Sequence, residues 1–99
     1  MNLQIIHTAG RFEVIGNFTL NNTELVKRQF NYLLDNYEEV VMSLRKVEKI
    51  DQNGIQVLKD IYAKANKRSK ILFVFGKENN VIKKAFKKNK VNYIFRENY

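Results

Sequence analysis

The sequence contains no cysteine and no proline, and only four of its 99 residues are glycine. Without cysteine, the chain can form neither a disulfide framework nor a thiolate metal site, which suits a reducing compartment. No apolar run approaches the roughly 18 residues that a membrane helix needs. The start Met1-Asn2-Leu3-Gln4 also lacks the basic residues of a signal peptide. We therefore expect a cytoplasmic protein with no transmembrane segment.

Motifs for catalysis and for cofactor binding are missing as well. The four glycines are scattered along the chain, so no glycine-rich loop can cradle a phosphate. His7 is the only histidine, and no Asp, Glu or His accompanies it at metal-ligand spacing. A packed or surface role suits this side chain better than metal binding. We expect no enzyme activity and hence no catalytic residue, together with no bound metal and no cofactor.

The residues that are present suit one folded domain. Hydrophobic residues make up 44% of the chain and charged residues 28%, both within the range of globular proteins. Seven Phe and five Tyr supply enough bulk for a single core at this length. No repeat, linker or low-complexity stretch divides the sequence. We predict one domain over residues 1–99.

Positive charge is concentrated in the second half of the chain. The net charge is +8, and the stretch from Lys64 to Lys90 contains ten Lys or Arg against one acid, Glu78. Such a field favours acidic partners, whether a protein surface, nucleic acid or anionic lipid. A solvated, lysine-rich surface explains the same residues without any ligand. Both interpretations stay open at this point.

The first half of the chain alternates between strand and helix patterns. Residues 3–7 and 12–15 read as two strands, and Ala9-Gly10 between them suits an antiparallel hairpin. From Asn22 or Thr23 the period becomes helical, and residues 40–44 then form a short apolar strand. The predicted inward face of this helix consists of Val26, Phe30, Leu33 and Tyr37.

The second half repeats the alternation. A helix follows Asp51, and the continuously apolar run 71–75 is typical of a central strand in a parallel sheet. A third helix covers about 79–88, where Asn89 can adopt the left-handed conformation that ends a helix. Residues 91–95 form a last short strand. The predicted fold is α/β, a mixed sheet of about five strands with three right-handed crossover helices, antiparallel at the first hairpin.

The most informative stretch runs from Val40 to Leu58. A strand, Val40-Val41-Met42-Ser43-Leu44, leads through a short loop to Asp51-Gln52-Asn53-Gly54 and then to a helix. This spacing resembles the STAS domain family, and in particular the anti-sigma-factor antagonists. The resemblance continues through the strand at Ile71 and the segment 91–95, and it covers the N-terminal hairpin in outline. It implies the STAS fold.

The resemblance also implies a function and a working surface. In that family the loop before the second helix docks onto a partner anti-sigma kinase, and the hydroxyl residue before the glycine is phosphorylated, which breaks the complex. A helix N-terminus provides favourable surroundings for that phosphate. Here the equivalent position is Asn53, preceded by Gln52, and neither side chain accepts a phosphate. We therefore expect partner binding without the usual phospho-switch.

Five residues form the predicted partner-binding surface. Asp51 precedes the helix and can cap it, a contact worth about 1 kcal/mol, or it can contact a partner backbone. Gly54 is explained by the close approach of either a partner or a neighbouring strand. Lys49 begins the predicted docking loop. Gln52 and Asn53 are predicted to be exposed there as interface hydrogen-bonders or as parts of a solvated turn.

Two other functions remain as alternatives. Small STAS subunits also accompany some lipid-transport ABC complexes, where the same loop would hold an ABC-transporter subunit. Binding of nucleic acid or an anionic surface by the run 83–90 is the third possibility. Nucleic-acid readers interleave exposed aromatics with such charge, whereas Phe86 lies on the inward face of the predicted helix. A solvated amphipathic helix therefore fits that run better.

Overall fold

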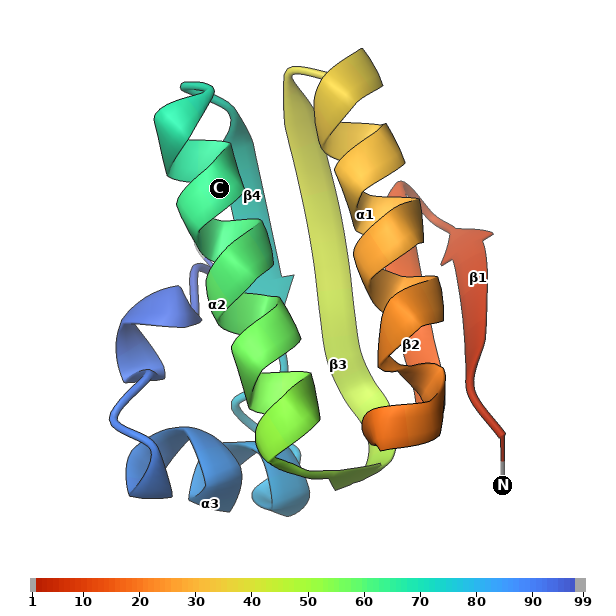
Figure 1. Cartoon of the computed structure of the whole chain (residues 1–99), viewed down its shortest axis with the longest axis vertical. Helices are drawn as coiled ribbons and strands as arrows, with labels where there is room; N and C mark the ends of the chain where they lie inside the picture. Colours follow the sequence, from red (N-terminus) through yellow and green to blue (C-terminus); the bar gives the residue numbers. More distant parts are fainter. Residues whose placement is uncertain (1, 98–99) are drawn as a thin grey trace.

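A mixed sheet with two helices on one face is the frame of the molecule (Figure 1). The computed structural model describes residues 2–97. Met1, Asn98 and Tyr99 of the predicted domain lie outside the described residues. No helix in the described part of the chain has the length and apolar character needed to cross a bilayer.

Within residues 2–97, four strands make up the sheet in the order β1-β2-β3-β4. They are β1 (Gln4–Thr8), β2 (Arg11–Phe18), β3 (Glu39–Ile50) and β4 (Ile71–Phe75). The pair β1–β2 is antiparallel, and β2–β3 and β3–β4 are parallel. Ala9 and Gly10 both have positive φ, 50° and 78°, as a two-residue hairpin turn of the right twist requires. The predicted mixed sheet and its first hairpin are confirmed.

The described residues form three α-helices, as predicted. Helices α1 (Thr23–Asn36) and α2 (Gln52–Lys67) lie side by side in front of the sheet, and α3 (Asn80–Lys88) lies at the lower end of the view (Figure 1). The described part of the chain also contains two short 3₁₀ turns, η1 (Leu20–Asn22) before α1 and η2 (Asn92–Ile94) after α3.

The core lies between the sheet and helices α1 and α2. The inward face of α1 consists of Val26, Phe30, Leu33 and Leu34, all buried. Tyr37 was predicted to belong to this face but is 55% exposed, because α1 ends at Asn36 and the backbone of Tyr37 is extended. The buried residues of α2 are Gly54, Ile55, Val57, Leu58, Ile61 and Ala65.

The prediction that residues 71–75 form a central strand is wrong, because β4 is at the edge of the sheet. Its side chains are nevertheless buried from Leu72 to Phe75. Helix α2 contacts one face of the strand, and on the other the guanidinium of Arg96 lies 5.0 Å from the ring of Phe73. Because both faces of β4 are covered, the strand can be apolar along its length although it lies at the edge of the sheet.

The predicted fifth strand at 91–95 is also wrong. Its centre forms η2, and only Arg96 makes an isolated antiparallel bridge to Val74. The cause lies at the end of α3. The φ angle of Lys90 is 57°, whereas that of Asn89 is −94°. The left-handed residue is therefore Lys90, and not Asn89 as predicted. Hydrogen bonds from Val91 N to Phe86 O (2.9 Å) and from Lys90 N to Lys87 O (3.2 Å) complete a Schellman-type cap that redirects the chain.

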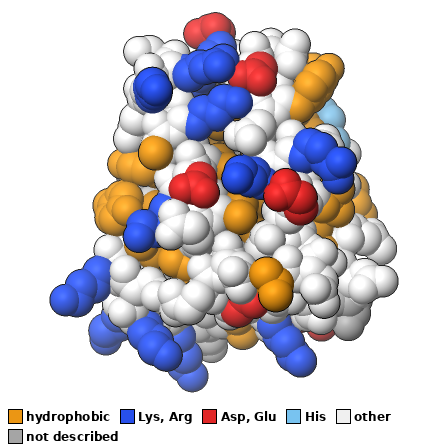
Figure 2. Space-filling model, viewed as in Figure 1, with side chains coloured by type: hydrophobic (Ala, Val, Ile, Leu, Met, Phe, Trp, Pro, Cys, Tyr) orange, Lys and Arg blue, Asp and Glu red, His pale blue; other side chains and the backbone are white. Residues whose placement is uncertain are grey.

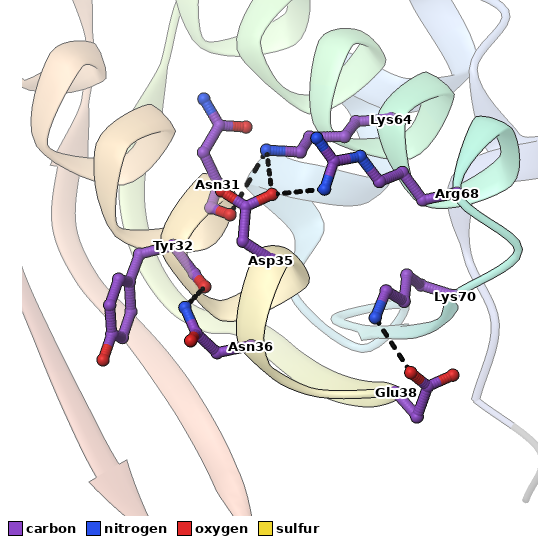
Figure 3. A network of polar contacts seen from close by, with 8 residues as sticks. All are labelled: Asn31, Tyr32, Asp35, Asn36, Glu38, Lys64, Arg68 and Lys70. Carbon is purple, nitrogen blue, oxygen red and sulfur yellow. Dashed lines mark hydrogen bonds and ion pairs between the residues drawn. The ribbon is translucent and has the colours of Figure 1, made fainter.

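The C-terminal ends of α1 and α2 are joined by a polar network (Figure 3). Asp35 accepts from Lys64 Nζ at 3.0 Å and from Arg68 Nη1 at 2.7 Å, and Lys70 Nζ lies 3.0 Å from Glu38 Oε1. The hydrogen bond from Lys64 is the main reason that the pKa of Asp35 is lowered. These carboxylates neutralise part of the positive charge at this end of the molecule. Because Asp35 and Glu38 are exposed, solvent screens these ion pairs and limits the stabilisation that they provide.

Candidate functional site

The predicted docking loop is in fact a tight strand-to-helix junction, which we define as Lys49 to Gly54. Strand β3 continues to Ile50, and α2 begins at Gln52. Only Asp51 lies between the two elements, so the predicted loop is absent. The strand extends this far because β2 is also longer than predicted, and the two pair in parallel up to Phe18 and Ile50.

Asp51 is the N-cap of α2, which confirms the prediction of a cap. Its Oδ1 accepts from the N–H of Gly54 at 3.0 Å. Its Oδ2 accepts from the N–H of Leu20 in η1, also at 3.0 Å. One carboxylate therefore ties the start of α2 to the turn after β2, although 31 positions separate Leu20 from Asp51 in the sequence.

These hydrogen bonds set the electrostatics of the junction. Partial burial of the Asp51 carboxyl is the largest single effect on its pKa and raises it, but the hydrogen bonds from Gly54, Leu20 and Asn53 together favour the charged form more strongly. The pKa of Asp51 is therefore lowered from its ordinary value. The group is a carboxylate at neutral pH, as a cap at the positive end of a helix dipole should be.

Gly54 is buried, and the neighbouring strand explains why it is glycine. A Cβ at this position would lie 2.5 Å from the carbonyl oxygen of Phe18 at the end of β2 and 2.8 Å from Cγ1 of Ile50. The first contact is with backbone, which cannot rotate away. The sequence allowed two explanations for Gly54, the approach of a partner or of a neighbouring strand. The close approach of β2 is enough to explain the glycine without a partner.

Lys49, Gln52 and Asn53 are exposed at the junction. The Nε2 of Gln52 donates to Asn89 Oδ1 at 2.9 Å, which links the start of α2 to the end of α3. Asn53 Nδ2 makes a long contact of 3.4 Å with Asp51 Oδ2. The junction thus presents neutral amide groups on a backbone that is held from both sides.

Sequence reasoning missed two residues of this site, Leu20 and Asn89. Leu20 is 62% exposed, although its N–H is fixed by Asp51. Asn89 holds the side chain of Gln52. Neither position has a motif around it, and both reach the junction only through the packing of distant segments. The exposure of Leu20 and its hydrogen bond to Asp51 are therefore features that local sequence patterns do not reveal.

The other sequence candidates lie away from the junction. His7 is on β1, where its ring stacks on Phe12 with centroids 4.2 Å apart. Within residues 2–97, no three His, Asp or Glu side chains converge in a way that could hold a metal ion.

Comparisons with known proteins agree with this architecture. The family model for the STAS domain matches residues 1–96. The solved structure of the anti-sigma factor antagonist SpoIIAA in its unphosphorylated form superimposes with a TM-score of 0.72 at 7% identity, over 98% of this chain and 88% of that one. An anti-sigma factor antagonist from Mycobacterium paratuberculosis gives 0.71 at 15% identity, over 95% and 81%. A search of curated proteins gives no match.

Proposed function

The chain belongs to the STAS domain family, and on that basis we propose that it is a non-enzymatic protein-interaction module. It docks onto a regulatory partner through the junction of β3 and α2. Two of the solved structures that share its fold are described as anti-sigma factor antagonists, which supports an anti-sigma factor with kinase activity as the partner.

The observation that carries this proposal is the double attachment of Asp51. Because its two oxygens hold the backbone at Leu20 and at Gly54, the junction has its shape before any partner arrives. A preorganised surface loses less conformational entropy on binding. Within the interface, Asp51 and Gly54 hold the backbone, and the contacts come from Lys49, Gln52 and Asn53.

Leu20 adds an exposed apolar side chain to this surface. It is 62% exposed, and its backbone N–H donates to the Asp51 carboxylate of the junction. Interfaces bury such an apolar anchor within a rim of polar groups, and the anchor supplies most of the binding energy. A partner with a small apolar pocket surrounded by amide or carbonyl groups fits this arrangement.

Regulation by phosphate on the junction is not part of the proposal. Asn53 occupies the acceptor position, and no Ser or Thr lies between Ser43 and Ser69 in the sequence. Ser43 itself is fully buried in β3 and is closed to a kinase. Binding is therefore constitutive, or it is controlled from the side of the partner.

The test begins with capture of the partner from the native cytosol, followed by incubation of the complex with ATP. We expect no phosphate on the wild-type chain, whereas Asn53→Ser restores an acceptor at the helix N-terminus, where a phosphate is tolerated. Mass spectrometry locates the modified residue. Phosphate on the wild-type chain at another residue would show that the switch has moved, and would contradict constitutive binding.

A further inference from the structure

A basic hollow lies between α3 and the C-terminal segment. It has a volume of about 430 Å³ and is lined by Lys77, Lys83, Lys87, Asn92 and Phe95. Lys83 and Lys87 are four residues apart on α3 and therefore lie on the same face of the helix. In Figure 2 one group of blue side chains lies over α3, at the lower left of the view, and others lie in its upper part.

The charge of this hollow is not neutralised within the described chain. From residue 79 to 96 the sequence contains six Lys or Arg and no Asp or Glu. Among residues 2–97, no ion pair involves Lys77, Lys83 or Lys87. The lysines near the ends of α1 and α2 differ, because Asp35 and Glu38 pair with them (Figure 3). The α3 surface thus presents a group of lysines that can bind an anion.

Aromatic rings accompany these lysines. The ring of Phe95 packs on that of Phe86 with centroids 4.5 Å apart. The Nζ of Lys77 lies 5.9 Å from the centre of the Phe95 ring. Phe95 also lines a second hollow of about 130 Å³, together with Tyr93, Lys70 and Arg96. Tyr93 is 53% exposed. The sequence pattern identified only Phe86, which faces inward. The turn η2 brings the rings of Tyr93 and Phe95 beside the basic face.

We propose that this face of α3 and the C-terminal segment binds single-stranded nucleic acid. Phosphates bind the lysines of the larger hollow, and one base stacks on Phe95, while Tyr93 is placed to stack a neighbouring base. Basic grooves with aromatic platforms bind single strands with little sequence preference, because every base has a stacking face. A duplex hides those faces. The site is separate from the docking junction, so either assignment can fail without the other.

Fluorescence anisotropy with a labelled oligothymidylate of about ten nucleotides tests the proposal. The matched probe is an abasic strand of the same length, which keeps the phosphates and removes the bases. We expect the thymidylate to bind roughly tenfold more tightly than the abasic strand. Its affinity should fall with salt, with a logarithmic slope of about −0.7 for each phosphate contacted.

Two double variants on the same helix separate the hollow from general charge. Lys83→Gln with Lys87→Gln removes two lysines that line it and should weaken binding by roughly tenfold. Lys84→Gln with Lys88→Gln makes the same change in net charge outside the larger hollow, and it should weaken binding less than about threefold. Equal losses in the two pairs would overturn the site.

The stacking role is tested with Phe95→Leu, which keeps an apolar side chain on Phe86. It should abolish the preference for thymidylate over the abasic strand and leave the salt dependence unchanged. If this variant does not fold, Tyr93→Leu at the exposed position should reduce the same preference. Equal affinity of the wild-type protein for both strands, or no binding to either at low salt, would overturn the proposal.

Discussion

The Cα of Gly54 packs against the carbonyl oxygen of Phe18, so closely that an added Cβ would lie 2.5 Å from that oxygen. Alanine normally favours a helix over glycine by about 1 kcal/mol. Here the overlap with backbone outweighs that gain, and Gly54→Ala should lower the free energy of unfolding by about 1–2 kcal/mol. Urea denaturation measures the difference.

A control for this prediction is Lys59→Ala, an exposed position on the same helix. It should change stability by less than about 0.5 kcal/mol. A Gly54→Ala protein as stable as wild type would mean that β2 and α2 can separate freely at this point.

Asp51 should tolerate asparagine poorly. As helix caps, Asn and Asp are equivalent. The carboxylate of Asp51, however, accepts from Gly54 with one oxygen and from Leu20 with the other. An amide has only one oxygen, so its NH₂ group would face a backbone N–H. Asp51→Asn should therefore cost about 1–2 kcal/mol, close to the cost of Asp51→Ala. An Asn variant with wild-type stability would show that Asp51 acts only as a helix cap and that its bond to Leu20 adds no stability.

Acid should remove the stabilisation that Asp51 provides. Its pKa is lower in the folded chain than the ordinary value of 3.8. The contribution is therefore complete above the unfolded pKa and is lost as the pH falls through the folded pKa. The stability difference between wild type and Asp51→Ala should be constant near neutral pH and should shrink below about pH 5. Chemical denaturation at several pH values gives this difference, and a gap that widens in acid would contradict the assignment.

Lys90 carries the left-handed conformation at the end of α3, with φ 57°. Glycine adopts this conformation without steric cost, so Lys90→Gly should raise stability by about 0.5–1 kcal/mol. Asn89→Gly should lower it by about 1 kcal/mol, since Asn89 is not left-handed and its side chain bonds Ala85 O and Gln52. Thermal melting compares the two. The reverse order would place the left-handed residue at Asn89.

Local spacing was enough to predict the cap at Asp51, and it left the close approach of a strand as one of two explanations for Gly54. It was also enough for the three helices and the first hairpin, because their apolar periods are regular. The extension of β3 to Ile50 was missed because the charged residues from Arg45 to Lys49 resemble a loop. Pairing with β2, a distant segment, makes them a strand.

The remaining differences also have non-local causes. The run 71–75 matches a central strand in composition, and only the sheet order places it at the edge. The turn at Lys90 decides that 91–95 is not a strand. The contact between Leu20 and Asp51 depends on how η1 packs beside α2. No pattern within a short window contains that information.

The affinity of the captured partner for Asn53→Asp is the most direct test of the docking surface. This substitution places one negative charge on the exposed side of the junction. The matched control is Asn66→Asp, an exposed position near the other end of α2. Isothermal titration should show binding weakened by more than about 1 kcal/mol for Asn53→Asp. The control should keep wild-type affinity, and both variants should remain folded in thermal melts. Unchanged affinity for Asn53→Asp, or an equal loss in the control, would remove the junction from the interface.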